Sequence, residues 1–343
     1  MKPETMSREL LLRAKLNALV RSQWGSDAHA ACAEASFPAG AALRPARPGG
    51  PAYILVDGAT YRSLGGVLAW GLRHGAGEIQ MLVDTAAATA ALLARRAGAF
   101  ALPVTVWRVD AARLRAATPA GFTRPPLLPP EAVPYADVLR AGGVEPVVEF
   151  GSLTGELLGL EVARVVVDAA GARLEVGVGS QDREAHRGLE PNREPSAQLA
   201  EVVAMIRRLR TPEGTAHLAN SLAGERWLRS VIVARPDLVG AAWLAPMPPA
   251  VPRSDLRTST AALAAGVDRD GQPLIVAAST GIDLDLVPAA ADGRRAGGLD
   301  ARLVLAVAPA DDHPRTRQLA ALLREPAEVV TVPSDWKGLA GTL

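Results

Sequence analysis

Two consecutive predicted strands in the middle of the chain carry carboxylate side chains. Glu161 lies in the apolar run 160–167 and Glu175 in the run 173–179, and residues 168–171 between them are typical of a hairpin turn. Side chains alternate between the two faces of a strand, so two carboxylates on one face would meet. Carboxylate oxygens of this kind bind Mg²⁺ or Mn²⁺. The spacing therefore predicts a divalent-metal site, provided that both acids lie on the same face.

The same alternation predicts that Glu161 and Arg164 lie on opposite faces of their strand, because they are three residues apart. A second interpretation of this segment stays open beside the metal site. Glu161, Arg164, Arg173 and Glu175 would form ion pairs across a solvated face of the hairpin, with no metal and no catalysis.

The order of acids, strands and helix resembles a known nuclease core. A strand with an acid (GLEV, 159–162) is followed by a turn, by a second strand with an acid (LEVG, 174–177), and by a helix. This pattern is similar to the hairpin of the PD-(D/E)XK, or restriction-endonuclease-like, nucleases. A similar order occurs in the last part of the chain, where Asp283 and Asp285 precede the predicted strand 302–307.

The resemblance implies metal-dependent cleavage of a nucleic acid. Glu161 and Glu175 would be metal ligands and catalytic residues, Glu156 would be a supporting acidic ligand, and Mg²⁺ or Mn²⁺ would be the cofactor. A bound metal ion of this kind stabilises the attacking and leaving oxygens at phosphorus. The implied partner is DNA or RNA.

The chain departs from the family at one position. The family has a lysine two residues after the second acid, where its charge stabilises the phosphate in the transition state. Gly177 stands at that place, two residues after Glu175, so Gln181 or Arg183 would have to take the role of the lysine. The resemblance therefore implies a nucleic-acid-associated protein that is either a divergent metal-dependent nuclease or a binding module without catalysis.

Two further hypotheses come from other parts of the sequence. Residues 6–23 predict an amphipathic helix, and together with the Pro-rich linkers they favour a non-enzymatic scaffold that binds a protein partner or a second copy of itself. Acids also follow predicted strands at Asp57, Asp84 and Asp311. Ligands of α/β proteins bind at strand ends, so these positions favour a small phosphorylated metabolite.

Apolar runs alternate with helical stretches in two parts of the chain. The segment 51–116 predicts strands at 53–56, 79–83 and 104–109 with helices between them. The segment 255–335 resembles it, because an Ala-Ala-Leu-Leu helix precedes a strand with Val-Thr-Val in both. An internal duplication, or a pseudo-symmetric pair in one sheet, is one interpretation. The other is that Ala-rich helices and Val-rich strands recur in any α/β protein of this composition. The last segment also predicts an extra strand at 282–287, where apolar and acidic residues alternate.

Proline- and glycine-rich stretches divide the chain. Breaks predicted at 38–51, 119–134 and 246–252 separate an N-terminal helix and linker (1–50), an α/β unit (51–134), a central segment (135–252) and a second α/β unit (253–343). The central segment predicts a β-hairpin followed by helices at 196–209 and 223–234. The fold class is therefore α/β, with mixed or mostly parallel sheets flanked by helices and two related units around the central hairpin segment.

Composition excludes several classes of protein. The 343 residues carry a formal charge of +1, which gives no general attraction to nucleic acid or to an anionic membrane. One cysteine, Cys32, excludes an internal disulfide and a cysteine-rich zinc site, which together with the absence of a signal-peptide pattern predicts a cytoplasmic location. No run of about 18 apolar residues predicts a membrane span. Only Lys2, Lys15 and Lys337 are lysines, so arginine supplies almost all the positive charge.

Overall fold

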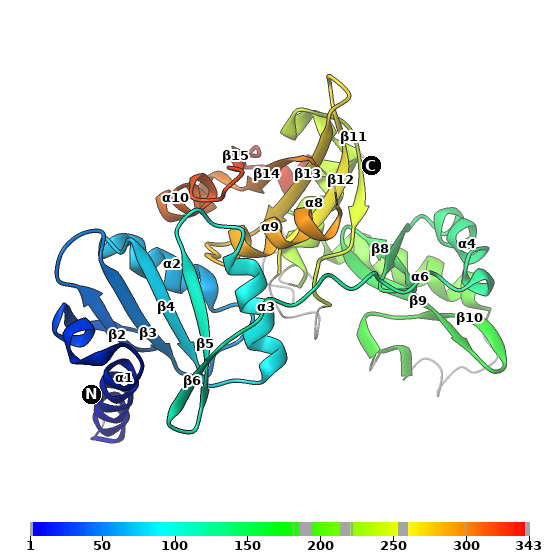
Figure 1. The fold of residues 1–343 in the computed structure, drawn as a ribbon. Coiled ribbons are helices and arrows are strands. Elements are labelled where there is room, and N and C mark those ends of the chain that lie inside the picture. Colours follow the sequence, from blue (N-terminus) through cyan, green and yellow to red (C-terminus); the bar gives the residue numbers. More distant parts are fainter. Residues whose placement is uncertain are drawn as a thin grey trace. The chain divides into compact units, whose positions relative to one another are not determined.

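The computed structural model describes residues 3–180, 182–184, 194–212, 220, 222–252, 260–298 and 300–339. The chain divides into two compact units, each made of separate stretches. Unit 1 consists of residues 1–122, 283–292 and 313–328, and unit 2 consists of residues 123–282, 293–312 and 329–343. The predicted α/β class is confirmed, with two mixed sheets and one antiparallel sheet flanked by helices (Figure 1). None of the described helices is long and apolar enough to cross a membrane.

Unit 1 contains a six-stranded sheet with the order β1-β2-β3-β4-β5-β6. Strands β3, β4 and β5 are parallel, and β1, β2 and β6 pair antiparallel at the two sides. The elements are α1 (Pro3–Ala30), β1 (Cys32–Phe37), β2 (Gly40–Pro45), β3 (Pro51–Val56), α2 (Leu64–Arg73), β4 (Glu78–Val83), α3 (Ala87–Ala97), β5 (Val104–Asp110) and β6 (Arg113–Ala116).

The central strands of this sheet are apolar on both faces, because both faces are covered. Helix α1 contributes Leu16, Leu19 and Val20 to a core that includes Tyr53 and Leu55 of β3. The intervening residues of β3 are equally buried, and α2 and α3 connect the parallel strands. The strands predicted at 53–56, 79–83 and 104–109 are therefore confirmed, as is the helix predicted at 6–23.

The third sheet repeats the topology of the first. Its order is β11-β12-β13-β14-β15, with β11 and β12 antiparallel and β13 parallel to β14. Both sheets follow the succession of a helix, two antiparallel strands, and then three strands joined by two helices. The elements are α8 (Gly224–Ala234), η2 (Pro236–Val239), β11 (Ala241–Met247), β12 (Ala262–Asp268), β13 (Pro273–Ser279), α9 (Leu286–Ala296), β14 (Arg302–Val307), η3 (Pro309–Asp311), α10 (Pro314–Ala321), β15 (Glu328–Thr331) and α11 (Trp336–Leu339).

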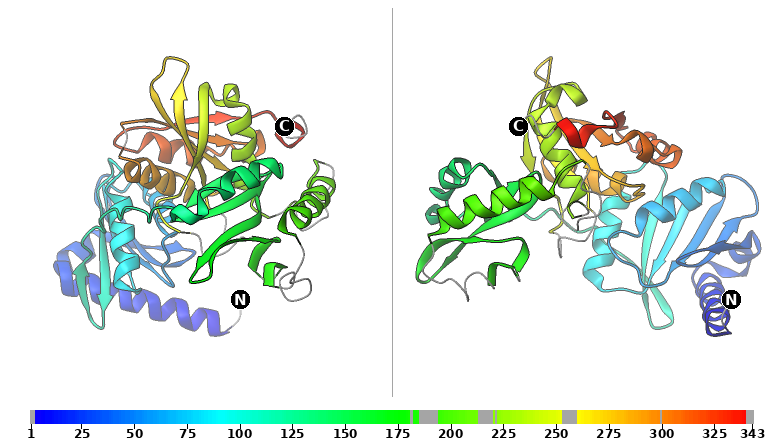
Figure 2. Two further views of the ribbon diagram at one scale, coloured as in Figure 1. Left: turned by 90° about the vertical axis from the view of Figure 1, so that its right-hand side faces the viewer. Right: turned by 180° about the vertical axis from the view of Figure 1, so that it is seen from behind.

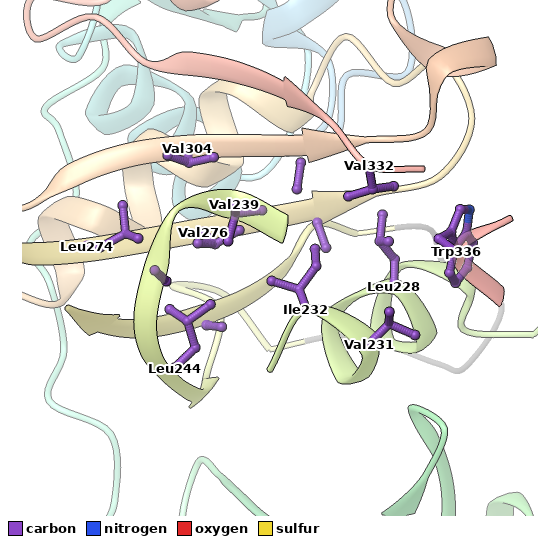
Figure 3. Close-up of a cluster of buried hydrophobic side chains, with 14 of the residues drawn as sticks. Leu228, Val231, Ile232, Val239, Leu244, Leu274, Val276, Val304, Val332 and Trp336 are labelled. Carbon is purple, nitrogen blue, oxygen red and sulfur yellow. The ribbon is translucent and has the colours of Figure 1, made fainter. Parts of the chain in front are cut away.

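Helix α8 forms the core of this second α/β region in unit 2. Leu228, Val231 and Ile232 point towards Val276 and Val304 on the sheet (Figure 3). Trp227 and Trp336 meet edge to face in the same cluster, with their ring centroids 5.6 Å apart. The helix predicted at 223–234 is thus confirmed, and the shared topology agrees with the interpretation of an internal duplication.

A four-stranded antiparallel sheet with the order β10-β9-β8-β7 lies in the central segment. The strands predicted at 160–167 and 173–179 correspond to β9 and β10, whereas β8 was not predicted. The elements are η1 (Pro130–Ala132), α4 (Tyr135–Ala141), β7 (Glu145–Glu149), β8 (Ser152–Leu157), β9 (Leu160–Asp168), β10 (Gly171–Val176) and α6 (Pro195–Leu209). Helices α4 and α6 contribute Leu139, Leu199 and Ile206 to the core on one face of this sheet (Figure 2).

Two tight turns fix the register of β7, β8 and β9. Phe150 and Gly151 have φ values of 49° and 76°, and Leu158 and Gly159 have 49° and 75°. Two consecutive residues with positive φ match the type I′ turn, which suits the twist of a two-residue hairpin. Leucine and phenylalanine rarely adopt this conformation. The chain therefore accepts local strain at both turns, which connect neighbouring antiparallel strands by only two residues.

The predicted strand at 282–287 is wrong. Asp283 accepts the backbone N–H of Asp285 on Oδ1 at 2.9 Å, and its carbonyl accepts the N–H of Leu286, where α9 begins. The alternating acids therefore belong to a helix start, where carboxylates satisfy free N–H groups.

The predicted linker at 38–51 is also wrong, because strand β2 runs through it. Ala41, Ala42 and Leu43 are buried between β1 and β3. Alanine gives only a weak apolar signal, so the prolines and glycines around it dominated the pattern. Strand β11 likewise continues through Pro246 into the break predicted at 246–252.

Gly159→Ala should strongly destabilise the protein. A Cβ at Gly159 would lie 2.2 Å from the carbonyl carbon of Arg226 and 2.3 Å from the nitrogen of Trp227, both backbone atoms of α8. Gly171 has φ +112° and open space around the same position, so Gly171→Ala is the matched control. Urea unfolding should show a loss of about 1 kcal/mol for the control and at least about 2 kcal/mol more for Gly159→Ala. Equal losses would mean that the turn does not pack on α8.

Candidate functional site

The acids of the predicted hairpin lie on one face of the central sheet because of a β-bulge. Across β8 and β9, Gly155 pairs with Ala163 but Glu156 pairs with Glu161, so Val162 is one extra residue in β9. A bulge of this kind resets the alternation of side chains. Glu161 therefore shares a face with Arg164, and the predicted separation of these two residues is wrong. Glu175, which pairs with Arg164 across β9 and β10, lies on that face as well.

Arginine side chains surround the three predicted acidic ligands. Glu161 is 5% exposed and accepts from Nε of Arg164 and Nη1 of Arg183, both at 2.9 Å. The hydrogen bond with Glu161 is the main cause that raises the pKa of Arg164. Glu175 accepts from Nη2 of Arg173 at 3.1 Å. Glu161 pairs with Arg164 and Arg173 pairs with Glu175, but each ion pair joins two residues of one strand, whereas the second interpretation placed them across the hairpin on a solvated face.

Glu156 belongs to a more deeply buried network. It is 1% exposed and accepts from Arg226 and, at 2.6 Å, from Nη2 of Arg229. Arg226 also donates to Glu149 at 2.7 Å. The two arginines are three residues apart on α8, so they lie on one side of the helix. This network binds the polar side of α8 to the glutamates of the central sheet.

The geometry gives these acids positive neighbours and no shared metal site. Among the residues that the structure describes, no group of three or more His, Cys, Asp or Glu side chains could hold a metal ion. Gln181 lies outside the described residues, and Arg183 is next to Glu161. The roles of Glu156, Glu161, Glu175, Gln181 and Arg183 in a metal-dependent nuclease stay predictions.

Glu156→Gln should destabilise the protein because it leaves two buried guanidinium groups short of negative charge. Loss of one partner from a buried ion pair costs about 3 kcal/mol or more. Glu131→Gln, on an exposed residue, should change the free energy of unfolding by less than about 0.5 kcal/mol. Chemical denaturation measures both. If Glu156 were a metal ligand, Mn²⁺ would raise the midpoint of the wild type and not that of the variant.

The acids predicted at strand ends also have partners. Asp57 accepts from Arg8 at 2.6 Å and Asp84 accepts from Lys15 at 2.8 Å, so both are bound by α1. In unit 2, Asp311 accepts the backbone N–H of Gly281 at 2.8 Å. None of these three acids lines the cavity that lies at the end of β3.

A cavity of about 520 Å³ opens at the carboxyl end of β3 within unit 1. This is the edge of a parallel sheet where α/β proteins bind ligands. Its lining combines the aromatic side chains of Phe37 and Trp70, the basic side chains of Arg62, Arg73 and Arg315, and the first turn of α2 at Ser63 and Gly66. The sequence analysis found none of the three arginines. The glycine pair at 65–66, in the first turn of the helix that follows β3, was the available signal.

The positive charge of the cavity is only partly neutralised. Arg62 donates to Asp283 at 2.8 Å, whereas Arg315 donates to the neutral amide oxygen of Gln318 at 2.7 Å. Arg73 is exposed and forms no ion pair with any described residue. The first N–H groups of α2 have no acceptor within the helix and add a partial positive charge. The lining therefore favours an anion.

One acid, Asp285, lies in the wall of the cavity. It is 9% exposed, and its Oδ1 accepts the backbone N–H of Gly65 at 3.0 Å. Burial raises the pKa of Asp285 to about 7, against a lowering by the hydrogen bond from Gly65. A Cβ at Gly65 would lie 2.2 Å from the carbonyl oxygen of Leu284, so only glycine permits this approach. The raised pKa means that Asp285 carries less negative charge near neutral pH than an ordinary aspartate would.

A buried ion cluster anchors this wall. Asp292, 0% exposed, accepts from Nε and Nη2 of Arg95, both at 2.8 Å, and from Nε of Arg96 at 3.2 Å. Arg96 also donates to the carbonyl oxygen of Tyr61 at 2.9 Å. The two-point contact with Arg95 fixes orientation as well as distance. Helix α9 and the loop before α2 are thereby held to α3.

The titration of Asp285 should be visible in how the free energy of unfolding depends on pH. Its pKa is about 7 in the folded protein and close to 3.8 in the unfolded chain, so the folded state binds the extra proton between these values. Stability is therefore fully present below pH 4 and is lost as the pH rises towards 7, by up to about 4 kcal/mol. Asp285→Asn should remove that slope in urea titrations at pH 4 to 8. Asp335→Asn, on an exposed residue, should leave it unchanged.

Comparisons with protein families, with curated proteins and with solved structures found no match for this chain. The side chains that line its cavities are the features that bear on what the protein binds.

Proposed function

We propose that this protein binds a small phosphorylated molecule with an aromatic or apolar part in the cavity at the end of β3. The observation that supports this most directly is the set of three arginines, Arg62, Arg73 and Arg315, around one cavity at a helix start. Guanidinium groups match the oxygens of a phosphate in two-point hydrogen bonds. Backbone N–H groups at the start of a helix favour the same charge.

The other half of the lining is apolar. Phe37 and Trp70 are both buried and lie edge to face, with their ring centroids 6.2 Å apart, and Nε1 of Trp70 donates to the carbonyl oxygen of Ser36. This hydrogen bond fixes the indole as part of the wall. A flat or apolar group of the ligand would pack there while its phosphate meets the arginines. The volume of about 520 Å³ suits a ligand of nucleotide size.

Binding of a nucleotide-sized anion should depend on the arginines that have no carboxylate partner. Calorimetric titration with adenosine 5′-monophosphate is the first experiment, beside adenosine and inorganic phosphate. Arg73→Ala and Arg315→Ala should each weaken binding of the nucleotide by about tenfold or more, which is the value of one charge-assisted hydrogen bond. Arg317→Ala is the matched control on α10, because Arg317 does not line the cavity.

The same titration separates this proposal from association with nucleic acid. Single- and double-stranded oligonucleotides, with Mn²⁺ and with EDTA, replace the mononucleotide. Binding or cleavage of oligonucleotides that is lost in a Glu161→Ala/Glu175→Ala variant and kept in Arg73→Ala would favour the nuclease hypothesis. Failure of all three small probes, or equal affinity in the arginine variants and in Arg317→Ala, would refute the proposal.

A further inference from the structure

A second and larger cavity, of about 620 Å³, lies within unit 2. Its lining comes from the start of β7, the end of β8, the C-terminal end of α6, helix α8 and helix α11. Three of its charged side chains, Glu145, Arg207 and Lys337, form no ion pair or hydrogen bond with any residue that the structure describes. Charged groups that line a cavity without partners point to a ligand that supplies them.

Glu145 supplies a carboxylate to the wall of this cavity. It pairs directly with Glu156 across β7 and β8, so two like charges face each other. Glu156 accepts hydrogen bonds from both guanidinium groups of α8, whereas Glu145 accepts none from them and, of the two, is influenced only by the charge of Arg229. Burial raises the pKa of Glu145, which reflects a carboxylate that has lost water and gained no donor. A cation placed here would relieve both the desolvation and the repulsion from Glu156.

Lys337 and Arg207 supply the positive charges of the same wall. The ammonium of Lys337 lies 5.2 Å from the ring centroid of Trp227 and 5.7 Å from that of Trp336, so two aromatic rings hold it at the wall. Arg207 extends from α6 towards Gly143, where a Cβ would be 3.4 Å from its Nη2. Both cations keep their hydrogen-bond donors available for an anion.

The rest of the wall is partly apolar, beside the polar side chains of Glu156, Arg210, Thr211 and Ser230. Leu157, Leu158, Val233 and Ala234 contribute to it, and none of these side chains carries a hydrogen-bonding group. A matching ligand therefore carries an ammonium group, a carboxylate and an apolar part. This is the chemistry of an amino acid or a short peptide with apolar side chains.

We infer that this cavity is a binding site for an apolar amino acid or a short apolar peptide. The ligand's ammonium group binds Glu145, its carboxylate binds Lys337 and Arg207, and its side chains pack against the wall formed by Leu158 and Val233. The inference does not depend on the phosphate site, because no residue lines both cavities. Failure at one site leaves the other unaffected.

The test is calorimetric titration of the full chain with L-leucine and with leucyl-leucine. Leucinamide, which lacks the carboxylate, and N-acetyl-leucine, which lacks the ammonium, are the matched probes. At least one of the first pair should bind, and its blocked analogues should bind at least about tenfold more weakly. Glu145→Gln and Lys337→Met should each produce a similar loss, and circular dichroism checks that both variants fold.

Two neighbouring substitutions serve as controls. Arg208→Ala is compared with Arg207→Ala, because Arg208 is next in the chain but does not line the cavity. Glu131→Gln is compared with Glu145→Gln as an exposed acid. Absence of binding by all four probes would overturn the inference, and so would binding that survives in Glu145→Gln and in Lys337→Met.

Discussion

Helix α8 is buried on an apolar side and on a charged side. Its charged side can be buried because each of its arginines there pairs with a glutamate. Leu228 and Ile232 pack on the sheet that contains β13 and β14. Arg226 and Arg229 point to the glutamates of β7 and β8. A buried guanidinium is costly unless a carboxylate balances it. The turn at Gly159 serves this pairing, because it lets the backbone of the helix approach the sheet, and the bulge at Val162 brings Glu161 to the same face as Arg164.

Secondary structure could be predicted from the sequence wherever the nearby residues in the chain determine it. Strands such as 79–83 are short, continuous apolar runs, and α6 follows the spacing of Leu199, Val203 and Ile206, so both were predictable. The bulge at Val162 was not predictable, because it is a property of two paired strands and not of one. The partners of Glu156 are about 70 residues away in the chain, so no local pattern connects them.

The candidate sites follow the same rule. The edge of the sheet was predictable, because ligands gather where parallel strands end, but the acids named there, Asp57 and Asp84, are bound by α1. The arginines that line the cavity come from three separate stretches of the chain, and only the fold brings them together. Arginine and lysine also differ in the contacts that they make in the structure. Arginine makes the two-point contacts inside the protein, and Lys337 stands apart, held by two tryptophan rings.

In unit 1, segments that occupy equivalent places in the two repeats meet each other. The loop after α3 pairs with the loop after α10 through Phe100 and Leu323, and the start of α2 contacts the start of α9 at Gly65 and Asp285. Two identical subunits in such an arrangement would place the same residue on both sides, either two glycines or two mutually repelling carboxylates. A single chain has no such restriction. It can place a hydrogen-bond donor, the N–H of Gly65, opposite an acceptor, the carboxylate of Asp285. The contact between these two segments is therefore complementary in the way that an interface between two different subunits is.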